Sequence, residues 1–182
     1  MSIASRALSL VVLTAAVWPL GGCSVDVQED GFGSRKDVDI RTPVGAMSVR
    51  TGVDADTGLP VFPGATPLRG DDEPESATVN IGSGLFGLNL AAAKFETDAE
   101  PDAVIRFYRD AMNAYGDVLQ CEGDVDFRGR PGRQRPVCKE RGFSSETQLV
   151  VGTEERHRLV SVKARRGGAE FAVVSIATRG QS

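Results

Sequence analysis

The chain has 182 residues, enough for one domain with a hydrophobic core, and its formal net charge at pH 7 is −4. The charge is uneven, because residues 23–102 hold 15 acidic and 6 basic side chains, whereas residues 103–182 hold 10 acidic and 14 basic ones. Such asymmetry is typical of two halves that pair across a fold, or of a basic surface for an anionic partner. Aromatic residues that could stack on bases do not alternate with the basic ones, which argues against nucleic-acid binding.

The N-terminal segment has the features of an export signal. Arg6 precedes an apolar run from Ala7 to Leu20. The run is 14 residues long. A helix needs about 20 apolar residues to cross a bilayer, so this run is too short for a stable span. A basic start, an apolar centre and small residues at the end predict a secretory signal peptide over residues 1–22, which is removed on export.

The end of this segment, Leu20-Gly21-Gly22-Cys23, resembles the lipobox of bacterial lipoproteins. The resemblance implies cleavage before Cys23, attachment of acyl chains such as palmitate to that cysteine, and a lipid-anchored protein of the cell envelope. Several acyl chains anchor a protein stably where one chain is marginal. Ser24 replaces the aspartate that retains such proteins in the inner membrane, which implies the outer membrane, facing the periplasm, in a Gram-negative cell. An ordinary cleaved signal beside an unrelated cysteine is the alternative.

The mature chain is expected to begin with a linker. Residues 23–36 are polar, contain two glycines and lack periodicity, so we expect a lipidated cysteine followed by a flexible tether. Residues 37–182 are expected to form a single domain. A second polar break is expected from Arg69 to Ser76.

Alternating apolar residues predict several strands. Val38 to Thr51 reads as a hairpin around Pro43-Val44-Gly45, whereas the two prolines between Leu59 and Ala65 exclude a central strand there. Other expected strands are Leu85–Glu96, a short one within Gly116–Cys121, and a final meander over Thr147–Gly152, Arg158–Arg165 and Glu170–Arg179.

One helix is predicted after Thr97-Asp98-Ala99-Glu100, which matches a capping box, with Pro101 in its first turn. Its apolar stripe comprises Val104, Ile105, Tyr108, Ala111, Met112 and Tyr115. Gly116 is the expected stop. Because this stripe needs a partner, we expect an α+β fold in which an antiparallel sheet carries one main helix on one face, as a two-layer sandwich.

The order of these elements resembles small exported bacterial domains of unknown function. The resemblance rests on Phe62-Pro63-Gly64-Ala65 and on Thr97 to Arg109, and covers about residues 59–179. It implies a compact fold and no established activity.

The cysteines predict a disulfide. With Cys23 lipidated, Cys121 and Cys138 remain as an even pair in an exported protein, and we expect them to be bonded around an Arg-, Gly- and Pro-rich loop, Glu122 to Pro136. A metal site is weakly supported, because no C-x-x-C spacing occurs and the single histidine is distant. No cofactor is expected.

The remaining charged positions suggest a binding protein. Exposed guanidinium groups suit an anionic envelope component or protein, and the candidates are Arg128, Arg130, Arg133 and Arg135. A solvated loop is the alternative.

Catalytic signatures are weak. His157 opens a strand beside a charged turn and is expected at the surface. Asp54-Ala-Asp56-Thr57-Gly58 is read as a plain turn rather than a calcium loop, because Ala65 stands where the last ligand would be. We therefore expect a non-enzymatic envelope module, with a small envelope hydrolase using carboxylates or His157 as the alternative.

Overall fold

The computed structural model describes residues 23–29, 36–52, 55–68, 76–84, 86–140 and 145–180. The expected signal peptide and residues 69–75 of the expected polar break lie outside the described residues.

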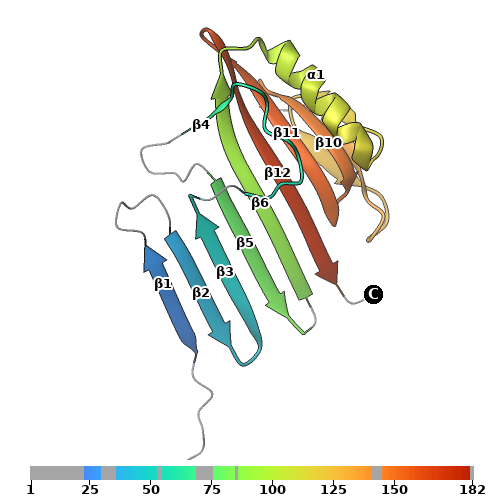
Figure 1. Ribbon diagram of the computed structural model, residues 1–182. Coiled ribbons are helices and arrows are strands. Elements are labelled where there is room, and N and C mark those ends of the chain that lie inside the picture. Colours follow the sequence, from blue (N-terminus) through green and yellow to red (C-terminus); the bar gives the residue numbers. More distant parts are fainter. Residues whose placement is uncertain are drawn as a thin grey trace, which may run out of the picture.

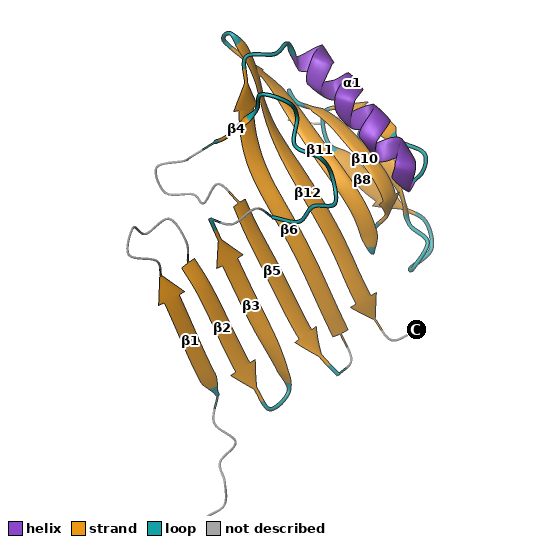
Figure 2. Ribbon diagram, viewed as in Figure 1, coloured by secondary structure: helices purple, strands orange, loops and turns teal. Residues whose placement is uncertain are grey.

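A single antiparallel sheet dominates the molecule (Figures 1 and 2). It has ten strands in the order β1-β2-β3-β5-β6-β12-β11-β10-β7, and β4 pairs with β6 beside this path. The strands are β1 Ser24–Glu29, β2 Lys36–Thr42, β3 Gly45–Thr51, β4 Thr66–Pro67, β5 Ser76–Ser83, β6 Phe86–Thr97, β7 Leu119–Glu122, β10 Thr147–Thr153, β11 Arg156–Arg165 and β12 Gly168–Gly180. A separate two-stranded hairpin joins β8 Val125–Arg128 to β9 Arg135–Cys138.

One helix, α1 Pro101–Met112, is followed by a single 3-10 turn, η1 Asn113–Tyr115. The broad prediction of an antiparallel sheet with one main helix is confirmed. The expected capping box is wrong, because the N-cap is Glu100 without a side-chain bond and Thr97 ends β6. Thr97 instead accepts a hydrogen bond from the Ala99 backbone N–H at 3.3 Å. The positive φ of Gly116, 133°, ends the 3-10 turn as expected of a glycine stop.

The predicted hairpin around Pro43-Val44-Gly45 and the final meander are confirmed. Two other expectations are wrong, and one strand was missed. The flexible tether is replaced over Ser24–Glu29 by β1, which pairs along its whole length with β2. The strand β5 was not expected, and the predicted loop Glu122 to Pro136 contains β8 and the start of β9. In each case the strand depends on a partner that local composition does not reveal.

The helix covers one end of the sheet. α1 packs on β10, β11 and β12, as Figure 1 shows on the face turned toward the viewer. The core beneath it includes Tyr108, Leu149 and Val160, each with no exposed surface, and Phe171, which is 3% exposed. Phe62 lies edge-on to the Phe107 ring, with ring centroids 5.3 Å apart, so the segment after β3 also contributes to this core.

The strands β1, β2, β3 and β5 lie far from the helix, at the other side of the sheet (Figure 2). Every β1 residue is exposed, and no residue of β2 or β3 is fully buried. The described part of the chain therefore has a covered half around β10–β12 and an open half around β1–β5.

Candidate functional site

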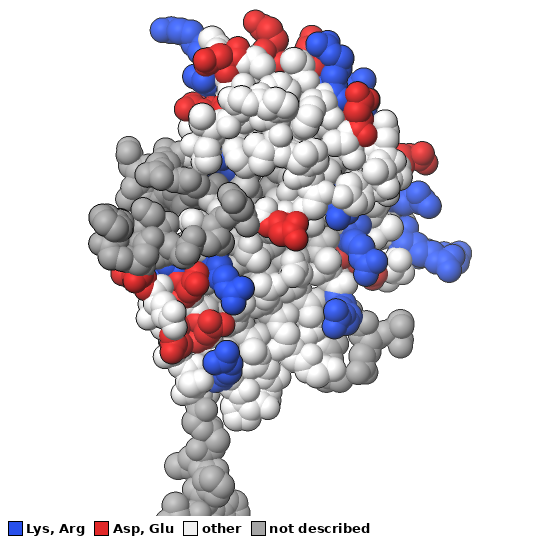
Figure 3. Space-filling view, viewed as in Figure 1, with Lys and Arg blue, Asp and Glu red and all other residues white. Residues whose placement is uncertain are grey.

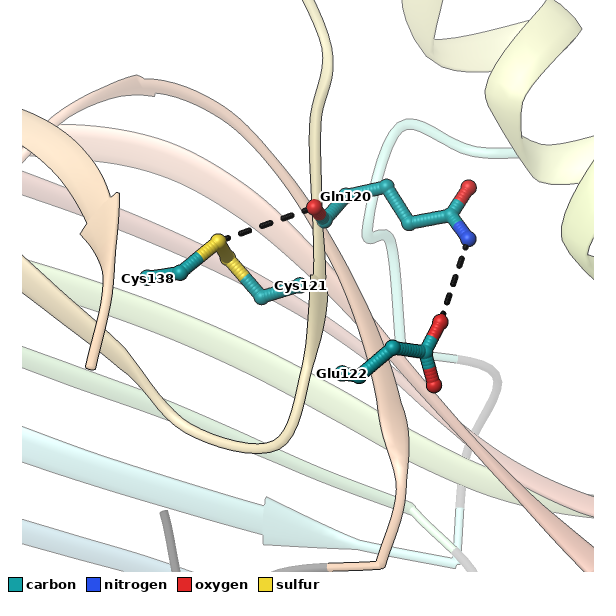
Figure 4. Close-up of a disulfide and its surroundings, with 4 residues drawn as sticks. All are labelled: Gln120, Cys121, Glu122 and Cys138. Atoms are coloured by element: carbon teal, nitrogen blue, oxygen red, sulfur yellow. Dashed lines mark hydrogen bonds between the residues drawn. A yellow bond between two sulfur atoms is a disulfide. The ribbon is translucent and has the colours of Figure 1, made fainter. Parts of the chain in front are cut away.

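The disulfide Cys121–Cys138 is present, as predicted, and ties β7 to β9. Cys121 is 2% exposed, and Cys138 Sγ lies 3.6 Å from the Gln120 carbonyl oxygen (Figure 4). The Gln120 side chain donates to Glu122 Oε1 at 3.4 Å and accepts a hydrogen bond from Arg109 of α1. The disulfide therefore holds the β8–β9 hairpin against the sheet.

The hairpin collects the predicted arginines at one exposed tip. Arg128 lies directly opposite Arg135 in the register, and Arg130 and Arg133 occupy the turn between them. Among the described residues, Arg128 alone of the four has an ion pair, 3.6 Å from Asp126. The like charges of Arg128 and Arg135 on neighbouring strands repel each other, and a bound anion would reduce this repulsion. No buried polar group of the described chain completes a pocket there, and the tip is an exposed cationic patch.

His157 does not lie at the surface, and this expectation is wrong. It is only 9% exposed, and its Nδ1 lies 3.0 Å from the Thr153 carbonyl oxygen and 3.1 Å from that of Glu154. Its ring packs on Phe127 of β8, with ring centroids 4.6 Å apart. A ring held by two carbonyl acceptors and an aromatic face supports the β10–β11 turn, and no observation in the described chain favours it as a catalytic base.

The expected turn at Asp56 is confirmed. The Asp56 carboxylate accepts a hydrogen bond from the Gly58 backbone N–H at 3.1 Å, while Asp54 lies outside the described residues. Arg158 Nε donates to the Thr57 carbonyl oxygen at 3.2 Å, and its guanidinium stacks 3.6 Å from the centroid of the Tyr115 ring. These contacts fix the segment before Leu59 against β11. Among the described residues, no group of three or more His, Cys, Asp or Glu side chains could hold a metal ion.

An apolar cavity of about 100 Å³ lies between this segment, β6, β12 and α1. Its lining includes Leu59, Phe95, Tyr108 and Val173. Burial raises the pKa of Tyr108 to about 12, and the backbone of Phe62, which lies near the hydroxyl without the geometry of a hydrogen bond, opposes the rise. A protonated phenol can donate a hydrogen bond and cannot act as a base at neutral pH. The sequence places Tyr108 correctly in the core but carries no signal of the cavity.

The most extensive feature that the sequence did not reveal is an apolar face of the open half. Directly paired residues lie on the same face of an antiparallel sheet. The register therefore forms two apolar rows across adjacent strands. One row is Val25, Ile40, Met47, Ile81 and Leu88, and the other is Val27, Val38, Val49, Val79, Leu90 and Ile176.

The opposite face of the same strands is polar. The row between the two apolar ones runs through Asp26, Asp39, Ser48, Asn80 and Asn89. On it the Asn89 side chain donates to Asn80 Oδ1 at 2.6 Å. Figure 3 shows this face, with acidic and basic side chains scattered over β1–β3. An alternation of apolar and polar positions is typical of strands that bury one face and expose the other.

The apolar rows have no cover among the described residues. The second row continues through Ile176 to His157, which the β8–β9 hairpin covers, so the hairpin occupies the same face further along. Extensive contacts of β1, β2 and β3 are confined to neighbouring strands. Val25 and Val27 are 63% and 53% exposed, and the inner positions of the rows are half-buried. We call the surface formed by these two rows the apolar face.

Within the described residues, no helix is long and apolar enough to cross a membrane. The sequence matches no family model, and no curated protein or solved structure is detectably similar to it.

Proposed function

We propose that this chain is a non-enzymatic module of the cell envelope, anchored by lipid on Cys23, whose apolar face binds a second copy of the same chain. The observation that carries the proposal is the pair of uncovered apolar rows opposite a polar face. Packing two such faces gives a sandwich with its sheets about 10 Å apart.

The size of the apolar face suits a dimer. Strands about 4.8 Å apart and same-face residues about 6.6 Å apart give each side chain about 30 Å² of flat sheet. The two rows and the adjoining Ala77, Ala92 and Val174 positions thus span roughly 400 Å² of flat surface per copy. This is about half of the ~800 Å² per partner of a standard interface, which suits a weak dimer that forms with increasing concentration.

Symmetry also favours a second copy. A flat apolar face is self-complementary about a two-fold axis, as closed dimers require. When that axis runs parallel to the strands, Cys23 of both copies lies at the same end of the dimer. Two lipid anchors in one membrane are compatible with that arrangement, and the shared membrane raises the effective concentration of the partners.

The anchor is supported by the lipobox and by the position of Cys23, which is exposed and directly precedes β1. We further propose the outer membrane, facing the periplasm, as its location in a Gram-negative cell. The exposed arginine tip is the proposed contact for an acidic envelope protein. At the covered end, α1 and the sheet are proposed to form the two-layer sandwich, a view that the burial of Tyr108 and Val160 supports.

Intact mass tests the anchor. Protein purified from bacterial membranes should have the mass of residues 23–182 plus acyl chains, and Cys23→Ala should lose the acyl mass. An unlipidated wild-type chain would refute the proposed lipid anchor but not the proposed dimer.

Sedimentation equilibrium of the mature chain tests the dimer. Wild type should associate with increasing concentration, whereas Val49→Asp on the apolar face should remain monomeric. Ser48→Asp, the adjacent residue on the polar face, is the matched control and should associate like wild type. A wild type that stays monomeric up to roughly 100 μM would overturn the proposed interface.

A further inference from the structure

One end of the sheet differs from the rest of the surface. The start of β1, the β2–β3 turn, the β5–β6 turn and the end of β12 all lie at the same end, because the strands alternate in direction. Figure 1 shows this end at the bottom, where the chain enters β1. We call it the anchor rim, and it comprises residues 23–24, 41–46, 82–84, 86–87 and 177–180.

The anchor rim carries exposed apolar side chains at the end of the sheet where Cys23 lies. Val44 at the tip of the β2–β3 turn is 81% exposed, and Phe86 at the start of β6 is 47% exposed. Exposed apolar side chains that converge on one edge mark an interaction surface more than single ones do.

The rim has an unusual charge. Its residues include Arg41 and Arg179 and no aspartate or glutamate, although acidic residues outnumber basic ones in the whole chain. Both arginines are exposed. In Figure 3 the lowest edge of the sheet is white and blue, with red groups directly above it over β1–β3, and charged side chains of both signs crowd the opposite end, near the start of α1. Their guanidinium groups suit phosphate, and their apolar stems can lie along acyl chains.

Both turns of the rim are held rigid in the same way. The Thr42 hydroxyl donates to the Gly45 carbonyl oxygen at 2.9 Å and accepts from the Gly45 N–H at 3.2 Å. Across the β5–β6 turn, Ser83 Oγ accepts from the Phe86 N–H at 3.1 Å. Hydroxyl clamps that close both turns present Val44 and Phe86 in fixed positions, which reduces the entropy lost when they bind.

We infer that the anchor rim docks onto the surface of an anionic phospholipid bilayer, with Val44 and Phe86 entering the interface and Arg41 and Arg179 contacting lipid phosphates. The strands then stand on the membrane, and the apolar face stays clear of the bilayer for a second copy. A lipid anchor combined with a basic, apolar surface is the two-signal attachment typical of stable membrane binding. The inference rests on the proposed envelope location, but the contact itself does not require the lipid.

Vesicle flotation of an unlipidated chain tests this contact. Residues 23–182 contain every described element, so a Cys23→Ser chain exported through a non-lipoprotein signal retains the whole fold. It should float with vesicles of phosphatidylethanolamine and phosphatidylglycerol and bind pure phosphatidylcholine vesicles at least about tenfold more weakly. The absence of flotation with the anionic vesicles would overturn the docking, whatever the mass of the native protein shows about its anchor.

Two pairs of variants locate the contact. Val44→Ser with Phe86→Ser should lower binding about tenfold or more, and Arg41→Gln with Arg179→Gln should lower it to a similar degree and weaken its dependence on salt. If the serine pair fails to fold, the glutamine pair carries the test, because its side chains are exposed.

Matched controls lie elsewhere on the molecule. Val61→Ser replaces a valine that is 54% exposed outside the rim, and Arg128→Gln with Arg130→Gln removes two charges from the hairpin tip. Both controls should bind vesicles like the parent. Loss of binding in the hairpin variant with none in the rim variants would assign the membrane contact to the arginine tip and refute the rim.

Discussion

The covered and the open halves of the sheet differ in how many of their faces are apolar and need a packing partner. Around β10 and the start of β11 both faces are apolar and both are covered, one by α1 and the other by the disulfide-bonded hairpin. Around β1–β5 only one face is apolar, and no described element covers it. The strand patterns differ accordingly, because Leu149 to Val151 is continuously apolar, whereas Val38 to Thr42 alternates. A strand of continuously apolar residues needs a packing partner on each face, whereas a strand of alternating apolar and polar residues needs a partner on one face only. For the open half, we propose that this partner is a second copy of the chain.

The largest expected effect of a substitution lies in the covered half. Leu149→Ala removes a fully buried side chain beneath α1. It should lower the free energy of unfolding by roughly 2–5 kcal/mol through lost transfer energy and a residual cavity. Urea unfolding followed by circular dichroism measures the change, and a loss below about 1 kcal/mol would contradict a tightly packed core there.

The disulfide should stabilise the same half. Replacing Cys121 and Cys138 together by serine should lower the free energy of unfolding by about 3 kcal/mol, because the unfolded chain regains the freedom of the loop. The matched comparison is wild type unfolded with and without reductant. Equal stability in both conditions would show that the hairpin is held by its packing on His157 alone.

The buried phenol predicts a smaller effect that depends on pH. Since the pKa of Tyr108 is raised from 10 to about 12, the native state favours the protonated form. The phenol's contribution to the free energy of unfolding, roughly 2–3 kcal/mol, is fully present below pH 10 and is lost as the pH rises toward 12. Tyr108→Phe should remove this part of the decline, measured as the difference between the two unfolding curves across that pH range. Parallel curves would mean that the hydroxyl is solvated.

The smallest expected effect lies in the open half. Ile40→Ala on the apolar face should change the unfolding free energy of the dilute, monomeric chain by about 1 kcal/mol or less, because the side chain has no cover there. At high concentration the same substitution should cost more, because the dimer buries it. Unfolding experiments at two protein concentrations distinguish these cases, and an equally large loss at both would indicate that this half is already covered.

Sequence reasoning succeeded where contacts are local. The helix, the β2–β3 hairpin and the final meander follow from periodicity and turn residues close in the chain. It failed where the partner is distant. β1 and β5 carry weak alternation beside polar breaks, and their neighbours supply the pairing.

The hairpin and the histidine show the same limit. The β8–β9 segment is rich in glycine and proline, and it is held by the disulfide and by Phe127 against His157, 30 residues further along. The burial of His157 is therefore invisible in its own neighbourhood. The cysteine pair was predictable because the even number of remaining cysteines and the predicted export signal together point to it. The rows of the apolar face became visible only with the register across the strands.

Thiol labelling tests the central claim, that the apolar face is covered by a second copy, most directly. Single cysteines are introduced at Val49 and, on the opposite face of the same strand, at Ser48, in a chain carrying Cys23→Ser and the intact Cys121–Cys138 bond. Our account predicts that labelling at position 49 slows as protein concentration rises, whereas labelling at position 48 does not change. Equal, concentration-independent labelling at both positions would contradict it.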